Sequence, residues 1–453
     1  MTTVARKLAA IKPGSLLAGV DLGLDSLAVV VLAGDGRRVD RFKTDHSREG
    51  YAYLSRRLGQ LVQPPAVSAV WIGMEPTNYY WKQLGTYLQQ QALPFRLVNP
   101  YTVHRHREGD QLDRAKDDWR DALVIAELLR TGKFTETQLR RGAYAELQIG
   151  HATFWRLRQE RGRQLTLLTN SLRQVFPEIA HVFKDLTCLT AQAVLRAGPA
   201  AVQIRALSWA EFLAQVRQVA TGKRLAVSRL HQLHALAQTS IGLIDGVEAL
   251  CFDLRASLAH LQLLDQQADA LLVRLRQHFH TLPEAPYVYS IEGLDELSAL
   301  GILAETGTLD NYTSGKDLIK LAGTQPTPNA SGRAHRAKTP FSKQGRSRLR
   351  LVLYWATLRL LSRNAAIAYH YQRLQQRAQH PLTKMEAVGA CMNKLLWYVW
   401  HVGHRRAVYD PQHWRQAQAA PAGSRPTSGA SVLHPRRSPP ARRALAATGG
   451  ATA

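Results

Sequence analysis

The sequence predicts an α/β domain followed by two mainly helical regions. Up to about residue 130, short apolar runs typical of strands alternate with amphipathic segments typical of helices. From about residue 143 onward, the apolar residues recur at helical spacing. Charge is unevenly distributed, since residues 318–385 contain no Asp or Glu. These observations predict a leader over 1–14, an α/β domain over 15–142, a helical spacer over 143–284, a mainly helical C-terminal domain over 285–405 and a basic tail over 406–453.

The α/β domain is predicted to begin with three strands. Residues 15–23 form one apolar run, and residues 27–44 predict two more strands around the turn Gly34-Asp35-Gly36. The continuous apolar run at 66–75 is typical of a buried central strand. The same patterns predict helices over 47–62 and 79–91, a short strand over 95–99 and a last helix beginning near residue 117.

Three aspartates, Asp117, Asp118 and Asp121, stand at the head of that last helix. Carboxylates at a helix N-terminus cap free N–H groups and oppose the macrodipole, which would account for all three. Asp118 and Asp121, however, share a face with the apolar residues that follow, so they lead into the predicted buried side. Buried carboxylates need a partner, and a divalent metal is one. On this stretch alone both interpretations stay open.

Two further carboxylates follow predicted strands: Asp21 ends the first strand and Glu75 ends the buried one. If these strands are neighbours and the aspartate helix packs across them, four carboxylates converge. Such a group is mutually repulsive unless metals lie between its members, and two Mg²⁺ ions held this way support phosphodiester chemistry. The segment GVDLG also fits the first phosphate loop of actin-like sugar kinases, but the sequence lacks that class's second phosphate loop and adenosine motif.

The charge balance points to a polyanionic partner. The chain has 59 Lys+Arg against 34 Asp+Glu, with a pI of about 10.4. Seven Lys/Arg lie between Arg333 and Arg350, which predicts a nucleic-acid footprint, the alternative being a solvated basic surface. Tyr354 and Trp355, in the helix that follows, are expected in the core. The candidate phosphate contacts are Lys116, Arg333, Arg336, Lys338, Lys343, Arg346 and Arg348.

A heptad series marks the spacer. Its a and d positions hold Val247, Leu250, Leu254, Leu261, Leu264, Ala268, Leu271 and Leu275, and Ser257 interrupts it. This spacing predicts either a coiled-coil seam between chains or a long amphipathic helix packed inside its own chain. The former would support a homo-oligomer.

The remaining features suggest a soluble protein of a reducing compartment. The three cysteines have neither disulfide-framework nor zinc spacing. The sequence shows no transmembrane run and no signal peptide, so no membrane partner is expected. The tail beyond about residue 416 has the composition of a disordered segment.

Several motifs together resemble the DEDD-type insertion-sequence transposases of the insertion-sequence 110 family. In the N-terminal half they are VDLG, GMEPT, VNPYTVHRHR and KDDWRDALVIAELL. In the C-terminal half they are IEGLDELSALGILAETG, LIKLAGTQPTPNASG and SKQGRSRLRLVLYWAT. The resemblance spans about residues 15–405. One departure is Glu292-Gly293-Leu294-Asp295, where the family has a Pro-Gly turn, and we expect Asp295 to weaken a backbone phosphate contact there.

The resemblance implies an RNase H-like (Holliday-junction-resolvase-like) N-terminal domain, a coiled-coil spacer and a C-terminal transposase domain. It implies that Asp21, Glu75, Asp118 and Asp121 bind Mg²⁺, two ions per site, and that Ser331 is the nucleophile. Such enzymes recombine donor and target DNA through a covalent phosphoserine and use a structured guide RNA encoded by the element. A dimer or tetramer in the bacterial cytoplasm, at the nucleoid, is expected. The alternatives are a junction nuclease that hydrolyses DNA with water and a non-catalytic DNA-binding protein.

Overall fold

The computed structural model describes residues 7–412 except 10, 12, 64–66, 77–78, 111–116, 136–138, 221, 223, 328–329, 332–333 and 336–339. The predicted tail beyond residue 412 and Lys116, Arg333, Arg336 and Lys338 therefore lie outside the described residues. Two compact units are present, residues 1–279 and residues 280–453. Among the described helices, none is long and apolar enough to cross a membrane.

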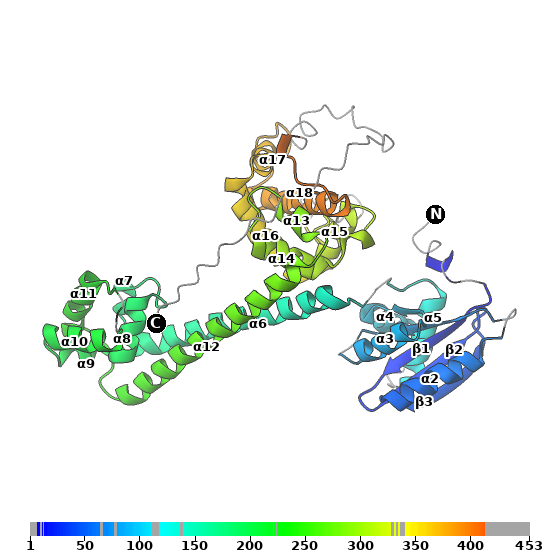
Figure 1. Cartoon of the computed structure of the whole chain (residues 1–453), viewed down its shortest axis with the longest axis horizontal. Helices are drawn as coiled ribbons and strands as arrows, with labels where there is room; N and C mark the ends of the chain where they lie inside the picture. The colour runs from blue at the N-terminus through cyan, green and yellow to red at the C-terminus, as the bar shows by residue number, and fades with distance from the viewer. Residues whose placement is uncertain are drawn as a thin grey trace, which may run out of the picture. The chain divides into compact units, whose positions relative to one another are not determined.

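A five-stranded sheet forms the centre of the N-terminal domain (Figure 1). Its strands are β1 (Leu16–Leu22), β2 (Ser26–Leu32), β3 (Arg38–Asp45), β4 (Val70–Met74) and β5 (Phe95–Leu97), in the order β3-β2-β1-β4-β5. The first three strands are antiparallel, whereas β1, β4 and β5 run parallel. All five strands were predicted from the sequence. The mixed α/β character of this domain is thereby confirmed.

Helices cover both faces of the sheet, because the strand residues alternate between two apolar cores. Val20 and Met74 face α2 (Arg48–Gln60) and α3 (Tyr80–Gln90). Leu17, on the other face, packs with Val124 and Ile125 of α5 (Asp118–Arg130). The helix α4 (Pro100–Asp110) was not predicted, since its side chains are mostly polar and its apolar spacing is weak. The α5 face is the one that matters for the candidate site.

Two long helices build the spacer: α6 (Gly142–Val175) and α12 (Val247–His280), which lie side by side (Figure 1). They run antiparallel, since Arg161 pairs with Asp265 at 2.6 Å and Ser171 Oγ donates to Asp253 at 2.7 Å. At the other end of the pair, Gly150 allows Leu275 to pack against the backbone of α6. The heptad face of α12 thus has a partner in its own chain, which favours the second interpretation of that series.

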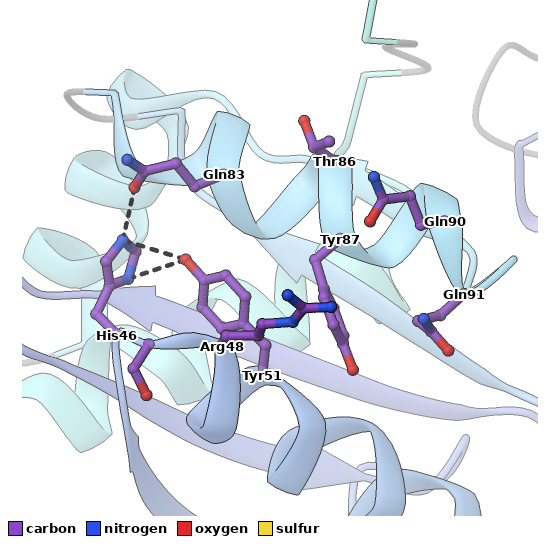
Figure 2. Close-up of a pocket in the computed structure, with 9 residues that line it drawn as sticks. His46, Arg48, Tyr51, Gln83, Thr86, Tyr87, Gln90 and Gln91 are labelled. Carbon is purple, nitrogen blue, oxygen red and sulfur yellow. Dashed lines mark hydrogen bonds between the residues drawn. The ribbon is translucent and has the colours of Figure 1, made fainter.

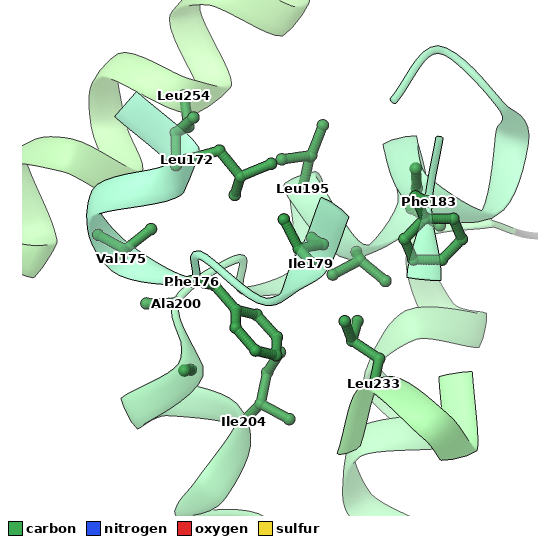
Figure 3. Close-up of a cluster of buried hydrophobic side chains, with 14 of the residues drawn as sticks. Leu172, Val175, Phe176, Ile179, Phe183, Leu195, Ala200, Ile204, Leu233 and Leu254 are labelled. Atoms are coloured by element: carbon green, nitrogen blue, oxygen red, sulfur yellow. The ribbon is translucent and has the colours of Figure 1, made fainter. Parts of the chain in front are cut away.

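A cluster of five short helices joins α6 to α12: α7 (Ile179–Val182), α8 (Leu189–Ala197), α9 (Ala201–Arg205), α10 (Trp209–Val219) and α11 (Val227–Gln238). Figure 3 shows their common core, in which Phe176, Phe183 and Leu233 are fully or almost fully buried. Leu172 and Leu254, from the two long helices, extend this core into the helical pair. Ser257, the break in the heptad series, is buried as well.

The C-terminal unit is mainly helical, as predicted. Its helices are α13 (Ala285–Tyr289), α14 (Glu296–Thr306), η1 (Leu309–Asn311), α15 (Gly315–Ala322), α16 (Ser347–Arg363), α17 (Ala365–Gln375) and α18 (Lys384–His404). Helix α18 packs against α13, η1, α15, α16 and α17, so it forms the centre of the unit. Two short strands, β6 (Ala330–Ser331) and β7 (Ala334–His335), lie between α15 and α16.

Candidate active site

Asp21 and Glu75 leave the sheet side by side. In the parallel pair of β1 and β4, Val20 lies opposite Met74. The residue that follows each of them is one of the two acids, so Asp21 and Glu75 are neighbours. Alternation along each strand places these acids on the α5 face, because Gly19 and Gly73, two positions earlier, both contact α5. The predicted neighbourhood of Asp21 and Glu75 is therefore present in the structure.

Helix α5 approaches the sheet closely because Gly19 has no side chain. A Cβ atom at this position would lie 2.0 Å from the carbonyl oxygen of Ala122 and 2.5 Å from the amide nitrogen of Ala126. Both are backbone atoms and cannot turn aside. Gly19 thus sets the distance between β1 and α5, and with it the position of the aspartates at the head of α5.

The three aspartates of α5 have different surroundings. Asp117 is the N-cap, and its side chain accepts a hydrogen bond from the amide of Trp119 at 3.2 Å. Asp121 is only 5% exposed, whereas about half of the Asp118 side chain is exposed. Capping therefore accounts for Asp117. Asp118 and Asp121 lie on the side of the helix that meets the sheet edge.

Lys43, which the sequence reasoning missed, reaches this group from β3. Its ammonium lies 2.8 Å from Asp118 Oδ2 and 5.3 Å from the centre of the Trp119 ring. Strand register explains the meeting, because Asp21, Ala28 and Lys43 lie in one row across β1, β2 and β3. The hydrogen bond to Asp118 raises the pKa of Lys43, and the charges of Asp117 and Asp21 act in the same direction. Predicting this contact from the sequence would require the register of β1, β2 and β3, which the sequence does not give.

The chemistry of these side chains fits a hard divalent cation, since carboxylate oxygens are its preferred ligands. Their present arrangement is more open than a metal centre. Across the described part of the chain, no three Asp, Glu, His or Cys side chains lie close enough together to hold a metal ion. Asp118 instead holds the ammonium of Lys43. A metal ion held by these carboxylates would need their side chains to lie closer together than they do here.

Ser331 lies on a hairpin whose base is closed by backbone hydrogen bonds. The amide of Lys343 donates to Gly323 O at 3.0 Å, Ser342 N to Gln325 O at 2.9 Å, and Thr327 N to Pro340 O at 3.0 Å. Nearer the tip, Ser331 of β6 pairs with Ala334 of β7. We call this segment, residues 323–345, the serine hairpin.

Two of the predicted phosphate contacts, both arginines with partly exposed side chains, pair with one buried carboxylate. Glu305 of α14 is only 2% exposed, and the Arg348 guanidinium lies 3.0 Å from its carboxylate. Arg346 lies 3.7 Å from the same carboxylate and donates to the Glu305 carbonyl at 2.7 Å. These two arginines therefore connect the end of the serine hairpin to α14. Lys343, the third described candidate, is exposed.

The expectation that Trp355 belongs to the core is wrong, because 54% of this residue is exposed. Tyr354 is half-buried and lines a hollow of about 350 Å³ with Phe341 and Met385. A helix of this unit buries only one stripe of side chains, and Trp355 lies just outside that stripe.

The turn at which the sequence departs from the family pattern contains Gly293, whose φ is 81°. Asp295, at the end of this turn, is the N-cap of α14 and pairs with Arg359.

Cationic side chains also gather around His370 on α17. Burial, together with the charges of Lys394, Arg373 and Arg377, lowers the pKa of this imidazole to about 4. Lys394 lies over the ring of Tyr398 at 5.4 Å from its centre, and burial lowers its pKa. His370 is therefore neutral at physiological pH.

A pocket lined by residues of α2 and α3 contains none of the four acids (Figure 2). It occupies about 570 Å³ between the start of α2 and α3, on the opposite face of the sheet from α5. His46 bonds Gln83 at 2.9 Å across it, and Tyr51 lies 3.2 Å from the same imidazole. Its lining contains no carboxylate, in contrast to the group of acids on the α5 side of the sheet.

Fold and site together define a class: a basic protein that presents carboxylates at the edge of a mixed sheet and carries a second, helical unit. Comparison with known proteins makes the class specific. Residues 18–177 match a transposase model of the DEDD insertion-sequence 110 type, and residues 285–372 match the transposase IS116/IS110/IS902 family. The two matches together cover more than half of the chain. The chain belongs to the insertion-sequence 110 family of transposases, as the sequence resemblance predicted.

Two relatives agree with this assignment. A mini-circle putative transposase for IS117 from Streptomyces coelicolor is 27% identical over 327 residues, which is 70% of this chain and 77% of the relative. A putative transposase, y4uE, from Sinorhizobium fredii is 28% identical over 171 residues, 37% of this chain and 47% of the relative. The chain is thus a DNA transposase, and its family indicates the use of a divalent metal.

Proposed function

We propose that this transposase cuts and rejoins DNA through a covalent phosphoserine at Ser331, assisted by Mg²⁺ held at the acid site. One observation carries the metal part of the proposal: Asp21 and Glu75 end adjacent parallel strands, and Asp118 and Asp121 begin the helix that packs on the same face. Taken with the family assignment, this layout also supports an RNase H-like fold for the N-terminal domain.

In this proposal the four carboxylates are metal ligands that differ in burial and position. Asp121, buried beneath the sheet edge, is the most rigid ligand, and Asp118 at the surface is the most mobile. Asp21 and Glu75 complete the set from the strand ends. When bound, two Mg²⁺ ions activate the attacking oxygen and stabilise the leaving oxygen.

Ser331 performs a transesterification. Its hydroxyl attacks the scissile phosphorus, so that a serine–phosphate ester forms while the bond to the 3′ oxygen of the DNA breaks and that oxygen takes up a proton. A DNA hydroxyl then attacks the phosphoserine, and the serine hydroxyl is restored. The phosphodiester energy is conserved, so the reaction needs no nucleotide triphosphate. The proposal requires that the same DNA contact the acids and Ser331, which belong to different units, within one chain or between two chains.

The partners follow from charge and family. A net charge of +25 supports binding of donor and target DNA and of a structured RNA, encoded by the element, that selects them. We propose a homo-oligomer, a dimer or tetramer, because two DNA partners must be held at once. The proposed location is the bacterial cytoplasm, at the nucleoid.

The test is a denaturing gel with labelled DNA, the flanking RNA and Mg²⁺. Wild type should give a covalent protein–DNA adduct that Ser331→Ala abolishes, whereas Ser347→Ala, an exposed serine at the start of α16, should retain it. Glu75→Gln and Asp118→Asn should also abolish joining. Free cleaved DNA without adduct, unaffected by Ser331→Ala, would instead identify a nuclease that uses water.

A further inference from the structure

The acid site already contains a cation supplied by the chain. The Lys43 ammonium lies 2.8 Å from Asp118 Oδ2, and the register of β1, β2 and β3 directs this side chain and Asp21 to the same face. Trp119 places its ring beside the lysine, 5.3 Å from the ammonium. The contact therefore depends on three elements, β1, β3 and α5, and is not a chance meeting of neighbours along the chain.

The ion pair between Lys43 and Asp118 is weak enough for another cation to replace the lysine. The two side chains are 44% and 52% exposed, and ion pairs at such positions contribute little net free energy. A divalent cation carries twice the charge of an ammonium and can bind several carboxylates at once. Lys43 can thus neutralise Asp118 and still give way to a metal.

We propose that Lys43 is the counter-ion of Asp118 in the metal-free enzyme, and that a divalent cation must displace it to bind. Lys43 and the metal then compete for one carboxylate, which makes Lys43 a positioning residue that sets the metal requirement. This inference rests on the proposed function, because it needs the acids to be the metal site.

Arg41 provides a matched control. It lies two positions before Lys43 on β3, so it faces the same side of the sheet, and its guanidinium lies 5.4 Å from the centre of the same Trp119 ring. Its removal deletes the same charge from the same strand without deleting the contact to Asp118. A purely long-range electrostatic effect would appear in both variants, and competition for Asp118 only in one.

The experiment measures Mn²⁺ binding to the full chain by electron paramagnetic resonance, without DNA. Lys43→Gln should tighten Mn²⁺ binding about two- to five-fold, the range that an exposed ion pair supplies. Arg41→Gln should leave the affinity unchanged, and Lys43→Arg should retain the wild-type value, because its charge can still pair with Asp118.

Asp121→Asn separates the inference from the proposed function. If Mn²⁺ binding needs Asp121 and is the same in wild type and Lys43→Gln, the competition is refuted and the metal site stands. An equal gain in Lys43→Gln and Arg41→Gln likewise refutes competition in favour of a general charge effect. If Asp121→Asn binds Mn²⁺ like wild type, the acids are not the metal site and both proposals are overturned.

Discussion

Replacing Gly19 by alanine should move Asp118 and Asp121 away from Asp21 and Glu75, because it pushes α5 off the sheet. The new Cβ would lie 2.0 Å from Ala122 O and 2.5 Å from Ala126 N, and an ordinary contact begins at about 3.4 Å. Helix α5 must therefore retreat by more than about 1 Å. Overpacking of a close-packed core costs about 1–3 kcal/mol, and we expect the upper end because both obstructing atoms are backbone.

The displacement should reduce activity as well as stability. A shift of about 1 Å at catalytic groups costs on the order of 100-fold in rate. Adduct formation measures this loss, and hydrogen exchange of the 118–130 segment measures how far α5 is loosened. Both are carried out on the full chain.

Gly59→Ala is the matched control, since nothing lies within 4 Å of a Cβ at this position of α2. As a glycine inside a helix, its replacement should stabilise by about 0.5–1 kcal/mol. Wild-type exchange of α5 and wild-type adduct yield in Gly19→Ala would refute the role given to this glycine.

Three further changes test other parts of the structure. Asp117→Ala should lower stability by about 1 kcal/mol, because the helix cap is lost, and should retain adduct formation. Asp121→Asn should abolish the adduct. Equal adduct yields in the two variants would contradict the assignment of Asp117 to capping and of Asp121 to catalysis. Arg348→Ala should lower stability by about 1–3 kcal/mol, because it removes the closer of the two arginine partners of the buried Glu305 carboxylate. Adding Glu305→Gln should recover part of the loss in a thermal melt. The pKa of His370 is about 4 in the folded protein and 6.5 in the free side chain. Between these pH values the unfolded chain binds a proton that the folded chain does not. Stability should therefore fall by up to about 3 kcal/mol as the pH drops from 6.5 to 4. His370→Gln should flatten that part of the pH–stability curve, and an unchanged slope would assign it to other groups.

Much of the N-terminal domain could be predicted because its signals are local. Apolar runs identified the strands. The sequence left open whether the strands that carry Asp21 and Glu75 are neighbours, and the parallel pairing of β1 with β4 meets that condition. The cap at Asp117 follows from position alone. The helix α4 was missed because its few apolar residues leave no periodic pattern.

Contacts that depend on register or on distant elements could not be predicted. Lys43 and Asp118 are 75 positions apart, and their meeting requires the pairing of three strands. The sequence shows that Arg346 and Arg348 are basic, but not that a buried Glu305 on another helix pairs with both. Trp355 is next to Ala356, which is buried, so an error of one position in assigning the apolar stripe of α16 was enough to predict Trp355 in the core.

The closed base of the serine hairpin has a consequence for how such enzymes can diverge. Because backbone hydrogen bonds join Gly323 to Lys343 and Gln325 to Ser342, residues can be added between β6 and β7 without separating the two ends of the serine hairpin. The entropy of closing a loop grows only slowly, by about 0.6 kcal/mol for each doubling of length. The length of the serine hairpin can therefore change while the helices on either side of it, α15 and α16, keep their packing.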